Sequence, residues 1–349
     1  MEYGLGNKII VNDEKNNYEC YETAEQDVFQ ESSIINQKLD WSREILSDMH
    51  FSTGKNPVEY KVCCYESKEI NAFSAKITSN SYVIALSTEL LIGMVVELEE
   101  YFIHLDLRRY FWGKKKTAKK HVQKVYEYIL LYVVLHEYYH ILNGHCDSAY
   151  AKRKIMAERA ISKERENNRY KQILECDADY CAVRSCMYII DEKYGRTDDR
   201  IFEIRILGFS IYYIFLKFQE LGHENMHYMH DLYVSDHPPA SIRFVYAFIS
   251  MTHIILAQIE EESAIKELNI IAEVGVYFDR IHFDADTFDL SLSALAYTER
   301  GMKHLEELHM GWNQLRNELE SVAYVSLKTN DPVDFTEYVW VDKDGNMIL

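Results

Sequence analysis

The chain has 349 residues, enough for one large domain or two ordinary ones, and 48% of them are hydrophobic. A formal net charge of −18 argues against general nucleic-acid binding, which requires a basic surface. The sequence shows no signal peptide, and its most apolar windows, 128–135 and 206–216, are too short to span a bilayer. We therefore expect a cytoplasmic protein without a membrane span, whose seven cysteines are thiols.

The N-terminal part, up to about residue 40, is polar and acidic with little periodicity, so we expect a loosely packed arm or a segment that faces a partner. A first helix is predicted to begin near Trp41. Three alternating stretches then predict strands at 59–65, 70–75 and 82–86, with a hairpin turn at 78–81 between the last two. A small sheet should therefore precede the helices.

Helical patterns dominate the rest of the chain. Ser87 and Thr88 are expected to cap a helix that begins at Glu89. A basic stretch with aromatic residues at 108–116 is interpreted as a solvated loop rather than a contact with an anionic surface. Further helices are predicted for the charged segment 151–171, for the apolar segments 201–218 and 240–258, and within 290–322, with a terminal hairpin at 337–349. The expected fold is α+β and mostly helical.

The segment that ends at Asn143–Gly144 contains the pattern H-E-x-x-H, formed by His136, Glu137 and His140. Residues four apart lie on one face of a helix, so the two imidazoles can bind one metal ion, and Glu137 can reach an attacking water. A second copy of the pattern begins at His223, and His223, His227 and His230 could bind another metal. Because that copy directly follows Gly222, has Asn225 and Met226 between its glutamate and second histidine, and leads into Asp236-His237-Pro238-Pro239, we interpret it as a polar loop.

Glu175 and Asp179 are four residues apart in a second helical segment. A zinc ion held by two histidines needs a third protein ligand, for which glutamate is common, and an aspartate can accept a hydrogen bond from a ligating histidine. The alternative is a solvated helical face. Leu174 and Ala178 beside these acids favour burial, and buried carboxylates without partners are costly.

Several nearby residues have weaker signals. His145 is interpreted as a histidine that supports or caps the site rather than a ligand. A thiolate site made of Cys146, Cys176 and Cys181 is an alternative that a zinc site with a glutamate base does not require. The stretch Asn71, Ala72 and Phe73 is either an ordinary strand or an edge that pairs with an extended substrate.

Taken together, four motifs resemble the gluzincin metallopeptidases, and within them the family M48. The motifs are Asn71-Ala72-Phe73, His136 to His145, Glu175 to Asp179, and His237-Pro238 with Arg243. The resemblance implies zinc ligands at His136, His140 and Glu175, a general base at Glu137, support from Asp179 and Arg243, and a role for His237 in stabilising an oxyanion or gating the site. It also implies an edge strand packed on a zincin-type pair of active-site helices.

In size and lack of membrane spans the chain also resembles the soluble Lit-type phage-exclusion peptidases. The implied function is a zinc endopeptidase acting on a protein or peptide substrate. Its peptidase domain would cover 59–255, between an acidic arm with the first helix at 1–58 and a helical region at 256–349. The enzyme could stay latent until it is triggered, and a protein partner could activate or inhibit it. The alternative is a zinc-stabilised regulatory module whose fourth coordination position is closed by His237, and which would bind no hydroxamate.

Overall fold

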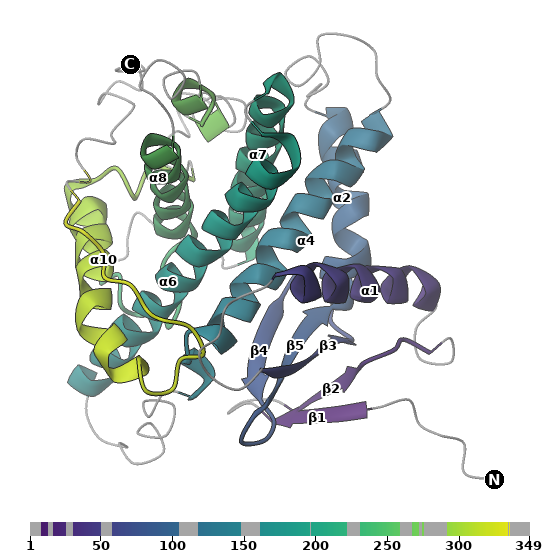
Figure 1. Cartoon of the computed structure of the whole chain (residues 1–349), viewed down its shortest axis with the longest axis horizontal. Coiled ribbons are helices and arrows are strands. Elements are labelled where there is room, and N and C mark those ends of the chain that lie inside the picture. Colours follow the sequence, from purple (N-terminus) through teal and green to yellow (C-terminus); the bar gives the residue numbers. More distant parts are fainter. Residues whose placement is uncertain are drawn as a thin grey trace. The chain divides into compact units, whose positions relative to one another are not determined.

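The computed structural model describes residues 8–12, 17–25, 31–49, 58–104, 118–147, 161–195, 197–221, 231–258, 267–271, 274–275, 292–333 and 335. Their fold is α+β and mostly helical, as predicted (Figure 1). The chain divides into two compact units, Met1–Ala151 with Leu319–Leu327, and Lys152–Glu318 with Lys328–Leu349. The boundaries expected at residues 58 and 255 therefore each fall inside one unit.

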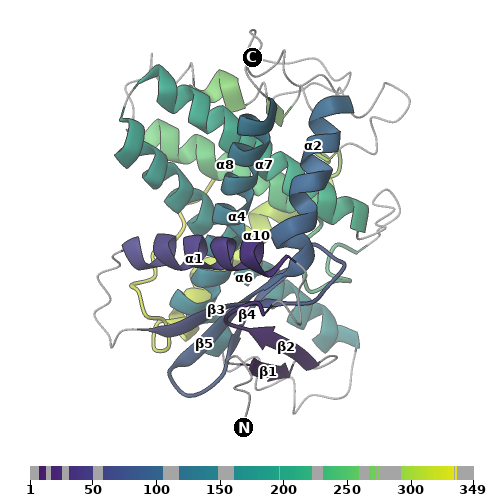
Figure 2. The ribbon, with the colours of Figure 1, turned by 90° about the vertical axis from the view of Figure 1, so that its right-hand side faces the viewer.

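The strands of the first unit form one sheet in the order β1-β2-β3-β5-β4 (Figure 2). β3 and β5 are parallel, and the other neighbouring strands are antiparallel. The bounds are Lys8–Asn12 for β1, Asn17–Tyr21 for β2, Glu59–Tyr65 for β3, Ala72–Lys76 for β4 and Ser81–Ser87 for β5. The three strands and the hairpin turn expected between residues 59 and 87 are thus confirmed.

The prediction of a loosely packed arm before Trp41 was wrong for the residues described there. β1 and β2 belong to the sheet, and helix α1 already begins at Ser32 and runs to Asp48. The side chain of Asn36 accepts a hydrogen bond from the backbone of Ala24 at 2.7 Å and donates one back at 2.9 Å. These contacts join residues far apart in the chain, so local sequence periodicity does not reveal them.

Helices cover one face of this sheet. Their bounds in the first unit are Glu89–Gly93 for the π-helix η1, Met94–His104 for α2, Ala118–Leu142 for α4 and His145–Asp147 for the 3₁₀-helix η2. Tyr60 of β3 packs against Tyr138 of α4 with ring centroids 5.1 Å apart. Alternate strand residues point to the opposite face of the sheet, where Cys63, Val83 and Ala85 belong to a separate apolar cluster. As predicted, Ser87 caps the first turn, with its Oγ accepting from Leu90 N–H at 3.1 Å.

Gly144 ends α4 where the sequence predicts, with a left-handed φ of +76°. A short segment from the far end of the chain, Leu319–Leu327, packs here; we call it the strap. Tyr324 N–H donates to the carbonyl oxygen of Leu142 at 2.7 Å, and a Cβ on Gly144 would lie 2.9 Å from the backbone nitrogen of Ala323. Glycine is therefore required by both conformation and space.

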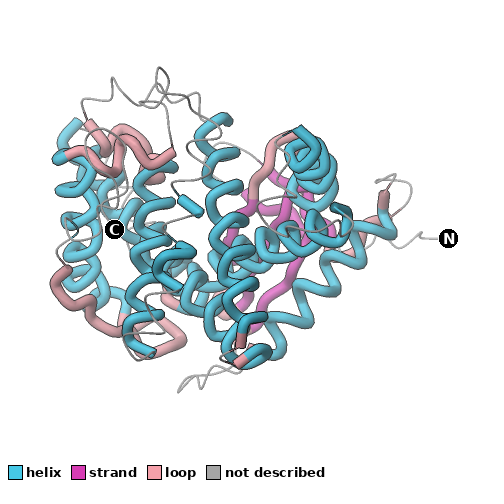
Figure 3. Tube along the Cα trace, turned by 90° about the horizontal axis from the view of Figure 1, so that it is seen from above, coloured by secondary structure: helices cyan, strands magenta, loops and turns pink. Residues whose placement is uncertain are grey.

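The second unit is built from long helices, and the described strands all belong to the first unit (Figure 3). The helix bounds are Ile161–Tyr194 for α6, Asp198–Leu221 for α7, Ala240–Gln258 for α8 and Glu299–Leu319 for α10. Helix α8 packs against α6 and α7. The apolar helices expected at 201–218 and 240–258 are confirmed as α7 and α8.

The window Ala240–Ala257 of α8 is long and apolar enough to cross a membrane, and 83% of it is buried within the fold. The core helix of a globular unit meets the same criteria. All seven cysteines are free thiols, as expected. The basic stretch 108–116, the second H-E-x-x-H copy with His223, His227 and His230, and the terminal hairpin at 337–349 lie outside the described residues.

Gly144→Ala should destabilise the protein more than Gly195→Ala. Both glycines have a positive φ, but a Cβ on Gly195 would meet nothing within 4 Å. The left-handed conformation should cost Gly195→Ala about 1–2 kcal/mol, and overpacking should add about 1–3 kcal/mol for Gly144→Ala. Urea unfolding would measure the difference. Equal losses for the two variants would show that the strap does not crowd the end of α4.

Candidate metal centre

The H-E-x-x-H segment lies in the most buried part of α4. The side chains of His136 and Glu137 are almost fully buried, with 6% and 7% exposure, and the residues just before them, Val133 to Leu135, are buried as well. Burying imidazole and carboxylate groups costs free energy unless they have partners. The burial of these polar residues within an apolar helix therefore indicates that they have partners, such as hydrogen-bonding groups or a metal ion, which offset this cost.

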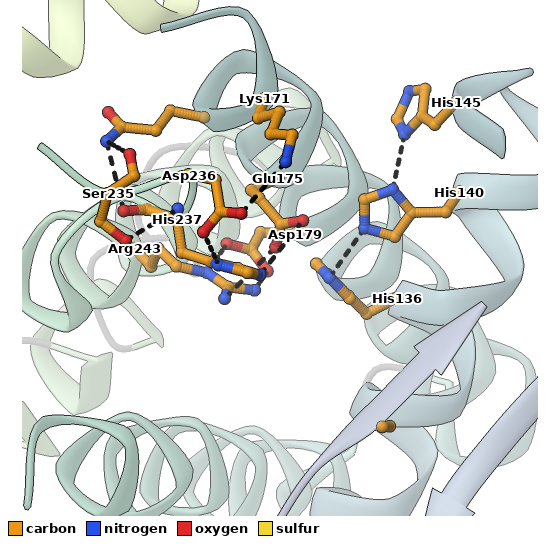
Figure 4. A network of polar contacts seen from close by, with 12 residues as sticks. His136, His140, His145, Lys171, Glu175, Asp179, Ser235, Asp236, His237 and Arg243 are labelled. Atoms are coloured by element: carbon orange, nitrogen blue, oxygen red, sulfur yellow. Dashed lines mark hydrogen bonds and ion pairs between the residues drawn. The ribbon is translucent and has the colours of Figure 1, made fainter. Parts of the chain in front are cut away.

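The two histidines of the motif face one another. Their Nε2 atoms are 3.1 Å apart, and the rings meet nearly edge to face (Figure 4). Two nitrogens that each lie about 2.0–2.1 Å from one tetrahedral zinc ion are separated by roughly 3.3 Å. The first unit thus presents two nitrogen donors at a separation that fits one ion.

His145 contacts the other ring nitrogen of His140. The Nδ1 atoms of these two residues are 2.9 Å apart (Figure 4), so one of them carries the proton. If His140 binds a metal through Nε2, its Nδ1 carries the hydrogen and donates it to His145. This contact fixes the tautomer and orientation of a ligating histidine. The sequence predicted a supporting role for His145, but not this contact.

The cysteines near the motif are poor candidates for a thiolate site. Burial raises the pKa of Cys146 to about 12, and its Sγ lies 3.7 Å from the Oγ of Ser74. In the second unit, burial raises the pKa of Cys176 well above its ordinary value. Among the described residues, the group whose ligand atoms converge is His136, His140 and Glu175, and it contains no cysteine.

In the second unit, Glu175 and Asp179 lie one turn apart on α6. The two carboxylate oxygens of Asp179 accept hydrogen bonds from Nε and Nη2 of Arg243, both at 2.8 Å (Figure 4). Nη1 of the same guanidinium is 3.4 Å from Oε2 of Glu175. Arg243 comes from α8, so one buried arginine orients both acids of the predicted E-x-x-x-D motif.

His237 lies beside Glu175, just before the two prolines that precede α8. Its Nδ1 is 3.0 Å from Oδ1 of Asp236, and its Nε2 is 3.8 Å from Oε1 of Glu175. The charge of Glu175 raises the pKa of His237, and the hydrogen bond with Asp236 adds to this effect against opposing desolvation. The same hydrogen bond holds the pKa of Asp236 below its ordinary range. His237 is exposed, so it remains accessible to another molecule.

The sequence analysis missed the residues that hold the segment 231–237. Gln172 and Asn168, both buried on α6, donate to backbone carbonyl oxygens of this segment, and Lys171 forms an ion pair with Asp236. No local motif marks these residues, because their partners lie about sixty positions away in the chain.

The predicted substrate edge is the outer strand of the sheet. β4 pairs with β5 at the end of the strand order, and Asn71 immediately precedes it. The N–H of Ser87 donates to the carbonyl oxygen of Asn71, and the N–H of Asn71 donates to Oγ of Ser87, both at 3.0 Å. Because Asn71 thus bonds toward β5, the antiparallel alternation directs the backbone groups of Phe73 toward β5 and those of Ala72 and Ser74 outward. The side chain of Asn71 accepts from Ala72 N–H at 2.8 Å.

His136, His140 and Glu175 each offer one ligand atom, and as a group they could hold a metal ion. Two imidazole nitrogens and one carboxylate oxygen are a donor set that suits zinc, among other divalent metals. Comparisons with protein-family models, with curated proteins and with solved structures find no match. The functional argument therefore rests on the donor set and the contacts described above.

Removing Arg243 should destabilise the second unit strongly. Arg243→Met leaves the fully buried carboxylate of Asp179 without its bidentate partner, which should cost about 3–5 kcal/mol. The double variant Asp179→Leu/Arg243→Met should be more stable than Arg243→Met, because it removes both charges. Urea unfolding of both variants would test this.

Lys217→Met is the matched control, because it breaks a partly exposed ion pair with Glu220 and should cost less than about 1 kcal/mol. A double variant less stable than Arg243→Met would contradict the assigned pairing.

Proposed function

We propose that this protein is a zinc-dependent endopeptidase of the cytoplasm. His136 and His140 of the first unit and Glu175 of the second would bind one zinc ion. The observation that carries the proposal is the pair of Nε2 atoms 3.1 Å apart on a buried helix, with His145 at the far nitrogen of His140. An imidazole pair oriented in this way by a third group is typical of a metal site.

Zinc bound at this site would supply a Lewis acid that lowers the pKa of a water molecule and polarises a peptide carbonyl. Glu137, next to the first ligand in sequence, would take a proton from the attacking water and pass it to the leaving amine. Its burial would limit the access of competing solvent. The single bond cleaved is the peptide C–N bond, and water supplies both the hydroxyl and the hydrogen.

His237 would assist from the second unit. Asp236 holds its Nδ1 at 3.0 Å, so Nε2 is left to face Glu175 and a bound substrate. A protonated Nε2 would donate a hydrogen bond to the oxygen on which negative charge develops during attack. We assign His237 this role rather than a permanent position in the metal shell, because its side chain is exposed.

The substrate would be an extended peptide or protein segment. The outward backbone groups of Ser74 and the outward carbonyl oxygen of Ala72 on β4 would pair with a strand added at the sheet edge, whereas the Ala72 N–H donates to Asn71. β4 also packs against α4, the helix that carries the motif. Addition of a strand would therefore bring a peptide backbone to the same unit as His136 and Glu137.

The purified protein should contain about one zinc ion per chain, and Glu175→Gln should bind it at least 10- to 100-fold more weakly, because a direct ligand is lost. Glu192→Gln is the matched control, since it makes the same change at an exposed position of α6. Metal analysis and chelator competition would measure both. Zinc binding unaffected by Glu175→Gln would exclude Glu175 as a ligand.

Glu137→Gln should keep zinc and lose hydrolysis of quenched fluorescent peptides by about 10²- to 10⁴-fold, because the amide cannot accept the proton. Glu127→Gln makes the same change two to three turns earlier on α4 and should leave activity unchanged. Undiminished hydrolysis by Glu137→Gln would rule out the general-base role. A wild-type protein that binds zinc but neither cleaves peptides nor binds hydroxamates would instead indicate a zinc-stabilised module.

A further inference from the structure

Gln172 is a fully buried glutamine on α6, one turn before Glu175. Its Nε2 lies within hydrogen-bond distance of three backbone carbonyl oxygens of the segment that precedes α8. The distances are 2.8 Å to Leu232, 2.9 Å to Ser235 and 3.2 Å to His237. One side-chain amide therefore contacts the segment at its start, middle and end.

The three carbonyl oxygens converge on a group that has only two N–H bonds. Without a donor between them, these oxygens would be held close together without this hydrogen bond, which is unfavourable where they are shielded from water. The curled path from Leu232 to His237 thus depends on the amide of Gln172. His237 is the last residue of that path, so its backbone position depends on the amide as well.

His304 of α10 fixes the orientation of this amide. Its Nε2 is 2.9 Å from Oε1 of Gln172, and its ring packs against Tyr233 with centroids 4.5 Å apart. Because Nε2 of Gln172 faces the carbonyls, Oε1 is the acceptor and His304 donates from Nε2. If the amide turned over, its oxygen would face three other oxygens. Burial lowers the pKa of His304 to about 4, so the imidazole is neutral at pH 7.

Buried Asn168 also holds the segment, by donating to the carbonyl oxygen of Tyr233 at 2.9 Å, but the ion pairs of the segment lie nearer to the surface. Arg165 donates to the carboxylate of Asp231 at 2.9 Å, with both side chains largely solvent-exposed. Lys171 pairs with Asp236 at 3.1 Å, where both are also partly exposed. Exposed ion pairs contribute little to stability. Among the described residues of α6, Gln172 is the buried one that donates to the backbone of His237.

We propose that Gln172 is a positioning residue for His237, and that His304 keeps Gln172 in the required orientation. Helix α10 thereby sets the position of the His237 imidazole beside Glu175. This inference rests on the proposed function only for the catalytic consequence of that position. The positioning itself is a property of the second unit and needs no metal.

The variants His304→Phe and His304→Gln separate the hydrogen bond from the packing. Phenylalanine keeps a ring against Tyr233 but cannot donate to Gln172, whereas glutamine restores a donor near the position of Nε2. The imidazole NMR resonances of His237 in ¹⁵N-histidine-labelled protein, identified by their loss in His237→Gln, would report its environment. We expect His304→Phe to shift these resonances and His304→Gln to restore them toward the wild-type positions.

His309→Phe is the matched control. His309 is a second buried histidine of α10, but it contacts Tyr246 and the carbonyl oxygen of Asp331 instead of Gln172. It should leave the His237 resonances in place. Unchanged resonances in His304→Phe, or equal shifts in His304→Phe and His309→Phe, would overturn the proposal.

Zinc content and peptide hydrolysis complete the test. Zinc content should stay at the wild-type level in His304→Phe, because neither His304 nor Gln172 offers a ligand. Peptide hydrolysis should fall roughly 10- to 100-fold in kcat with little change in KM, since the change acts through the position of His237. If the wild-type protein bound no zinc, the proposed function would fail while the NMR comparison would still decide the positioning role.

Discussion

A polar side chain that leaves water is costly without a partner, and this constraint shapes the candidate metal centre more than any single ligand does. In the first unit, His136, His140 and His145 form a chain of imidazoles whose ring nitrogens meet in pairs. In the second unit, the carboxylate of Asp179 is matched by the fork of Arg243. Such arrangements are rigid because each group is held by its neighbour, and rigidity is what a metal site requires.

Helix α6 organises the second unit through the regular spacing of its polar residues. Arg165, Asn168, Gln172, Glu175 and Asp179 recur at intervals of three or four residues and so lie along one face. Arg165 is exposed, Glu175 is half-buried, and Asn168, Gln172 and Asp179 are buried. The first three positions hold the segment 231–237, and the last two carry the acids. A single helix thus fixes both a candidate ligand and the segment that delivers His237 next to it.

Local patterns in the sequence predict much of this architecture. Apolar periodicity predicts α4, α7 and α8, strand alternation predicts β3 and β5, and Gly144 marks a helix end that needs a left-handed residue. The motif spacing predicts which residues share a helical face. It cannot predict that Arg243 orients Asp179 or that Gln172 holds the backbone of His237, because these contacts depend on how α6 packs against distant segments. β1 and β2 were missed for a similar reason, since their few apolar side chains are buried by sheet neighbours that lie far away in the chain.

The strap has a consequence for how the protein is made. Leu319–Leu327 belongs to the first unit, although the residues on either side of it belong to the second. The end of α4, where Tyr324 binds the carbonyl of Leu142, cannot be completed until residue 324 has left the ribosome. During synthesis, the end of the helix that carries His136 and His140 therefore gains this contact only after most of the second unit has been translated. Neither unit is one continuous stretch of chain, so a fragment cut at a single point would lack part of one of them.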